Sequence, residues 1–111
     1  MQIVFMVLNR VEKLDELLHR LHESGVPDAT FLDSRGMAKE LAEHNEFRFL
    51  GSLRSLFAAE RKESKVIFTI VKDEMIPVIS RVANEVTGGL NKPNTGILFA
   101  LPLSYTEGLA D

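Results

Sequence analysis

The chain has 111 residues, enough for one domain with its own core, and its 45% hydrophobic and 26% charged residues are typical of a globular protein. With 13 basic and 16 acidic side chains it has no positive excess to neutralise phosphates, so nucleic-acid binding is not expected to be its main function. It contains no cysteine, which excludes disulfides and thiolate zinc sites and fits a reducing cytoplasm.

The first third of the chain predicts a strand, a helix and a second strand. Residues 2–8 (QIVFMVL) are apolar and rich in β-formers, but too short to span a membrane and without the basic segment of a signal peptide. From residue 11, apolar residues recur at helical spacing until Ser24-Gly25, where glycine favours a left-handed helix end. After a turn at residues 26–28, a more polar strand is expected over residues 29–37.

The last third continues the alternation. Residues 65–71 (KVIFTIV) predict a third strand. A second amphipathic helix is expected to open at Asp73 or Glu74, because Pro77 is tolerated only near a helix start, and to end at Thr87.

A fourth apolar strand over residues 97–101 completes the order β-α-β-β-α-β. This order predicts an α+β domain of the ferredoxin-like class over residues 1–111. We expect a four-stranded antiparallel sheet with strands one and three in the centre, the polar second strand at an edge, and both helices on one face.

Alternate residues of a strand point to opposite faces, and here both alternations are apolar. One set is Ile3, Phe5, Val7, Val66, Phe68, Ile70, Ile97, Phe99 and Leu101. The other, which we expect on the open face, is Val4, Met6, Leu8, Leu32, Ile67, Val71 and Leu98. At about 1.5–3 kcal/mol each, seven uncovered side chains represent roughly 10–20 kcal/mol of unrealised burial. Other copies of the chain are the simplest cover, and the alternative is residues 38–64 folding back over the face.

Residues 38–64 form a long arm where a hairpin of about 2–5 residues is usual. The arm holds several large apolar residues, and helical spacing after Ser52 predicts a short amphipathic helix with a basic end. A further helical stretch is expected over residues 38–44. We interpret the arm as a partner-contacting segment, the alternative being a decoration packed on the oligomer.

The stretch VTGGLNKPNTGILFALPL, from Val86, is the candidate ligand cradle. Backbone N–H groups between Thr87 and Gly96 can surround an anion, Lys92 can add charge, and further side chains can donate hydrogen bonds. The alternative is that Gly88-Gly89 only ends the helix and that the following residues only form a surface turn. The candidate ligand-binding residues are Gly36, Thr87, Gly88, Gly89, Lys92, Asn94, Thr95 and Gly96.

No grouping in the sequence indicates a catalytic nucleophile or a metal centre. His19 and His22 are three residues apart on the first helix and could share a metal, but histidines at the edge of the core explain them better. We therefore predict no catalytic residues and no metal site.

The order of elements resembles the P-II nitrogen-regulatory signalling proteins. The resemblance rests on Gly36 after the second strand, Thr87-Gly88 at the helix end, Gly96 before the last strand, and the long arm. It implies a ferredoxin-like homotrimer whose sheets face the threefold axis. It also implies an adenine nucleotide, ATP or ADP, in the cleft between subunits, and an arm that docks on a transporter or enzyme in response to a small effector, 2-oxoglutarate in that family.

The chain departs from the family in three places. Its glycine loop is longer, its tail (Ser104, Tyr105, Thr106, Glu107) has no basic residue to hold phosphates, and its arm has no glutamine. Two alternatives therefore stay open. One is a dimeric ferredoxin-like enzyme whose cavity is lined by Thr69 or Arg35, and the other is a trimer similar to the copper-tolerance proteins, without nucleotide.

Overall fold

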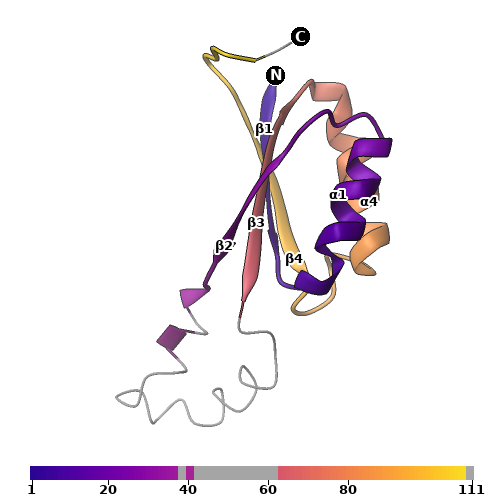
Figure 1. Ribbon diagram of the computed structural model, residues 1–111, viewed down its shortest axis with the longest axis vertical. Helices are drawn as coiled ribbons and strands as arrows, with labels where there is room; N and C mark the ends of the chain where they lie inside the picture. The colour runs from indigo at the N-terminus through magenta and orange to yellow at the C-terminus, as the bar shows by residue number, and fades with distance from the viewer. Residues whose placement is uncertain (38–39, 42–62, 110–111) are drawn as a thin grey trace.

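Strands and helices alternate along the chain in nearly the expected positions (Figure 1). A computed structural model describes residues 1–37, 40–41 and 63–109. The elements in order are β1 (Gln2–Leu8), the 3-10 turn η1 (Val11–Lys13), α1 (Leu14–Glu23), β2 (Thr30–Ser34), β3 (Ser64–Val71), the 3-10 turn η3 (Asp73–Met75), α4 (Ile76–Thr87) and β4 (Gly96–Pro102).

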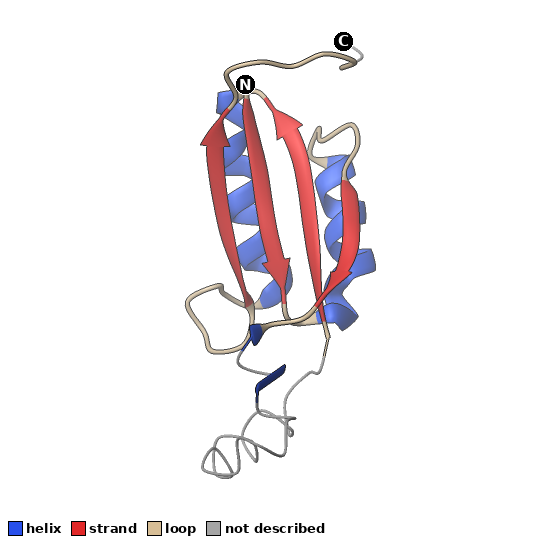
Figure 2. Ribbon diagram, turned by 90° about the vertical axis from the view of Figure 1, so that its left-hand side faces the viewer, coloured by secondary structure: helices blue, strands red, loops and turns tan. Residues whose placement is uncertain are grey.

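The four strands form one sheet in the order β2-β3-β1-β4, and every neighbouring pair is antiparallel. Figure 2 shows α1 and α4 behind the same face of this sheet. The α+β class, the antiparallel sheet, the central position of the first and third strands and the edge position of the more polar β2 are therefore confirmed.

Both helices begin with a 3-10 turn and have one apolar side. Pro77 is the second residue of α4, where its missing N–H needs no partner within the helix. Gly88 ends α4 in the left-handed conformation (φ 86°), the role expected of a glycine at this position.

The second strand is shorter than the expected 29–37. It ends at Ser34, because the carbonyl of Gly36 accepts a hydrogen bond from the N–H of Glu40 (3.0 Å) and a helical turn begins there. The arm expected at residues 38–64, with both of its expected helical stretches, lies almost wholly outside the described residues.

The core lies between the sheet and the two helices. Thr69 is the polar side chain buried on this side of β3, and its hydroxyl donates to the carbonyl of Asp28 (2.7 Å), which satisfies it. In the described part of the chain, no helix has the length and hydrophobicity needed to cross a membrane. The buried apolar residues are Val4, Met6, Leu8, Leu14, Leu17, Leu21, Val26, Ile67, Val71, Ile79, Val82, Ala83 and Val86.

Candidate functional site

One face of the sheet carries no described helix (Figure 2), and its three longest strands place apolar residues on this face. The register of β3, β1 and β4 places nine apolar side chains on it in three rows of three. We call these nine side chains the open face. Its rows are Ile70–Ile3–Leu101, Phe68–Phe5–Phe99 and Val66–Val7–Ile97.

The middle row of the open face is an aromatic ladder across three strands. The rings of Phe5 and Phe99 stack with centroids 5.3 Å apart, and Phe5 and Phe68 are tilted at 5.9 Å. Such pairs stabilise beyond simple burial. At the β4 edge, Ile97 is 62% exposed and Phe99 is 45% exposed, so the ladder ends at solvent within one chain.

The structure reverses the expected assignment of the two faces. The set expected to be open, such as Val4, Met6 and Ile67, lies in the core, and the other set is uncovered. When both alternations are apolar, the pattern itself cannot tell which one the helices cover. Leu32 belongs with the open set, because it pairs with Val66 and is 49% exposed, whereas Phe31 lies on the helix side.

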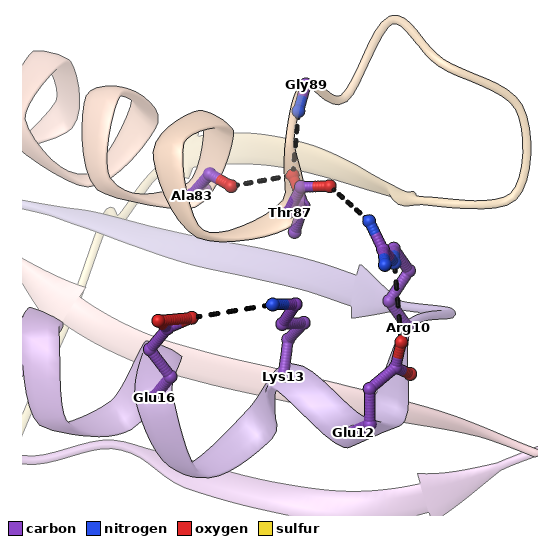
Figure 3. A network of polar contacts seen from close by, with 7 residues as sticks. All are labelled: Arg10, Glu12, Lys13, Glu16, Ala83, Thr87 and Gly89. Atoms are coloured by element: carbon purple, nitrogen blue, oxygen red, sulfur yellow. Dashed lines mark hydrogen bonds and ion pairs between the residues drawn. The ribbon is translucent and has the colours of Figure 1, made fainter.

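The glycine loop (residues 88–95) joins α4 to β4 and begins from a buried threonine. Thr87 is fully buried, and its hydroxyl donates to the carbonyl of Ala83 (2.8 Å) and accepts from the N–H of Gly89 (3.3 Å; Figure 3). The hydroxyl of Thr87, predicted to be a ligand contact, is therefore already used to shape the loop.

A side chain at Gly89 or at Gly96 would collide with neighbouring atoms. A Cβ on Gly89 (φ 124°) would lie 2.7 Å from Oδ1 of Asn91, and one on Gly96 would lie 2.4 Å from the carbonyl oxygen of Val7. Gly96 is therefore required for β4 to approach β1, whatever else it does.

Several polar groups of the loop are used within the fold. The N–H of Leu90 donates to Oδ1 of Asn84 (2.9 Å) and that of Lys92 to the carbonyl of Gly89 (3.1 Å), while the buried hydroxyl of Thr95 donates to the carbonyl of Lys92 (2.8 Å). An anion at this loop would consequently depend on side chains more than on a nest of backbone donors. Asn94 takes the left-handed conformation (φ 59°) that asparagine tolerates well, and Lys92 is exposed.

Gly36 is apart from the other predicted site residues within one chain. It follows β2 at the same end of the sheet as the glycine loop, but β2 and β4 are opposite edges with β3 and β1 between them. A Cβ on Gly36 would meet nothing within 4 Å. A site that uses Gly36 together with the loop needs a second copy of the chain.

The sequence analysis missed Asn9 and Arg10, which hold the two ends of the glycine loop. Arg10 donates from Nη1 to the carbonyl of Thr87 (2.9 Å), and the N–H of Asn9 donates to the carbonyl of Thr95 (3.0 Å). Figure 3 shows Arg10 beside the helix end, with Glu12 on its other side. A usable signal was present, since the residues that follow β1 must lie next to the start of an antiparallel β4.

The residues of the alternative interpretations are not grouped into a site. His19 is exposed and pairs with Glu23 (3.1 Å), and the described residues include no cluster of three potential metal ligands. Thr69 is satisfied in the core, and Arg35 is exposed and pairs with Glu40 (3.0 Å). A hollow of about 220 Å³ lies between α1 and β2, lined mainly by apolar side chains such as Leu18, Leu21, Val26 and Phe31.

A comparison of the sequence with protein-family models and with curated proteins found no match.

Proposed function

We propose that this chain is a P-II-like regulatory protein, a homotrimer that assembles through the open face of its sheet. It binds a small anionic effector, such as an adenine nucleotide, at the glycine loop, and contacts a partner transporter or enzyme through the arm at residues 38–64. The observation that carries the proposal is the open face, with nine apolar side chains in three rows and none of the described helices over them.

The topology supports a ferredoxin-like domain. Taken from the other edge, the strand order is β4-β1-β3-β2, in which each helix connects two strands that are not neighbours in the sheet. We expect such an order of a split β-α-β arrangement, in which one face of the sheet is left without helices.

The energy available from the open face favours assembly. Three of the nine side chains are about half exposed and the other six are partly buried, so complete burial of the nine stabilises by roughly 3–11 kcal/mol per chain. An apolar patch of this kind is uncommon on a monomer and typical of an interface.

A ring of copies also accounts for the positions of the predicted site residues. In a cyclic oligomer the contact is head-to-tail, so one edge of each copy faces the opposite edge of the next. With β2 of one copy beside β4 of its neighbour, Gly36 of the first lies near the glycine loop of the second. The resemblance to P-II proteins favours three copies in this ring.

Two phenylalanines with nearly equal exposure provide a matched test of the interface. Phe99 (45% exposed) is on the open face, whereas Phe31 (48% exposed) is on the helix side of the sheet. Glutamate at either position removes a half-buried ring from the monomer, but in the proposed assembly only Phe99→Glu also buries a charge at the interface. We expect light scattering after size exclusion to show that Phe99→Glu dissociates and that Phe31→Glu remains a trimer.

Two results would contradict the proposed interface. One is a Phe99→Glu variant with the same mass in solution as the wild type. The other is equal dissociation of both variants, which would show that added charge alone disrupts the assembly. Circular dichroism of each variant confirms that the chain is folded.

A further inference from the structure

Two cations lie against the paired glycines at the end of α4. Nη1 of Arg10 is 3.7 Å from the position that a Cβ of Gly88 would occupy, and Cε of Lys92 is 3.8 Å from the corresponding position at Gly89. Arg10 and Lys92 come from opposite ends of the sequence and flank two consecutive residues without side chains. Gly88 and Gly89 place no side chain of their own beside these two basic residues.

Arg10 is held in place without being buried. Its bond to the carbonyl of Thr87 (2.9 Å) fixes the guanidinium at the base of the loop, and its side chain remains 34% exposed. A guanidinium has five N–H donors in a planar fork that suits phosphate oxygens, and one bond to a carbonyl leaves most of them available. A preorganised and accessible guanidinium is well suited to binding an oligophosphate.

A carboxylate already lies beside this guanidinium. Oε2 of Glu12 is 3.4 Å from Nε of Arg10, in an ion pair that is partly exposed to solvent. Exposed pairs of this kind contribute little to stability and break at little cost. A ligand with several negative charges can therefore replace Glu12 at Arg10, and Glu12 weakens the binding of any anion that does so.

We infer that Arg10 is the phosphate-recognising residue of the glycine-loop site and that Glu12 is its built-in competitor. The ligand class is an oligophosphate, either free or as part of a nucleotide. This inference rests on the proposed effector site at the loop and adds to it a residue that supplies positive charge. Arg10 acts with Lys92, and each of the two lies beside one glycine of the pair.

The test measures the affinity of the full chain for ATP and for inorganic triphosphate by isothermal titration calorimetry. We expect Arg10→Ala to weaken binding of both ligands at least tenfold and Glu12→Gln to strengthen it several-fold. Added salt should weaken wild-type binding more than binding to Arg10→Ala, because one exposed charge contact is lost. Arg81→Ala is the control, since Arg81 is exposed on α4 about 9 Å along the axis before Thr87 and should leave both affinities within twofold.

Weaker binding of ATP but not of triphosphate by Arg10→Ala would overturn the assignment of Arg10 to phosphate. Because Arg10 also fastens the loop, its effect is compared with Arg10→Lys, which keeps the charge, and with Glu12→Gln, which leaves Arg10 intact. An unchanged affinity in Glu12→Gln would overturn the role of Glu12.

A second pair of changes separates this inference from the proposed function. If Gly89→Val with Lys92→Ala abolishes ATP binding while Arg10→Ala does not, the loop is the site and Arg10 has no part in it. If the wild type binds neither ATP nor triphosphate, the effector site and the role of Arg10 both fail. The trimer is then tested independently by the Phe99 and Phe31 variants.

Discussion

The two faces of the sheet are nearly equal in hydrophobicity but differ in what covers them. On the helix side, Leu8 and Leu17 are fully buried, and Ile67 is 3% exposed. On the open side, the same strands carry nine apolar residues of similar size, of which Ile97, Phe99 and Leu101 are 45–62% exposed. One face therefore stabilises the monomer through burial, and the other has apolar surface left that contact with further copies of the chain can bury.

Replacing one isoleucine on each face by alanine should give the largest difference in the free energy of unfolding. Ile67→Ala leaves a cavity in the core and should reduce the free energy of unfolding by about 2–5 kcal/mol at every protein concentration. Ile97→Ala, at a position that is 62% exposed, should have little effect on the dilute monomer and lower the melting temperature only where copies associate. Urea unfolding at low and high protein concentration measures both effects, and a concentration-independent loss in Ile97→Ala would argue against the interface.

Substitutions of two glycines near the ends of the edge strands should have smaller effects on stability. Gly96→Ala would place its Cβ 2.4 Å from the carbonyl of Val7, so β4 must shift, and we expect a loss of about 1–3 kcal/mol. Gly36→Ala meets nothing within 4 Å, and should change stability by less than about 1 kcal/mol. Thermal unfolding measures both, and equal losses would show that the close approach of β4 to β1 is not what requires glycine at residue 96.

The ion pair between Lys65 and Asp33, between β3 and the edge strand β2, should give the smallest effect. The side-chain hydrogen bond to Asp33 raises the pKa of Lys65 above its ordinary value of 10.5. Because the folded pKa is the higher one, the pair stabilises fully below pH 10.5 and loses its contribution as the pH rises through the folded value. Asp33→Asn should therefore melt slightly below the wild type at neutral pH and together with it at strongly alkaline pH. A gap that widens as the pH rises would contradict this sign.

Local chemistry made much of the fold predictable. Apolar runs with β-formers marked β1, β3 and β4, helical spacing marked α1 and α4, and Gly88 marked the end of α4. The end of β2 was not predictable in this way, because it depends on a hydrogen bond between Gly36 and Glu40 that competes with the strand ladder.

The identity of the open face and the role of Arg10 were beyond the sequence for a different reason. Both depend on tertiary placement. The connections between strands and helices determine which face of the sheet the helices cover. The register between β2 and β3 places Leu32 beside Val66. Arg10 reaches the carbonyl of Thr87 across 77 positions of sequence. By contrast, the glycines of the loop were recognisable because their requirement is local.

The central claim is that the open face is a contact between copies of this chain. Native mass spectrometry of the wild-type protein, diluted through the micromolar range, tests it most directly. The account predicts a dominant species with three times the mass of the chain. A folded monomer throughout that range would contradict it.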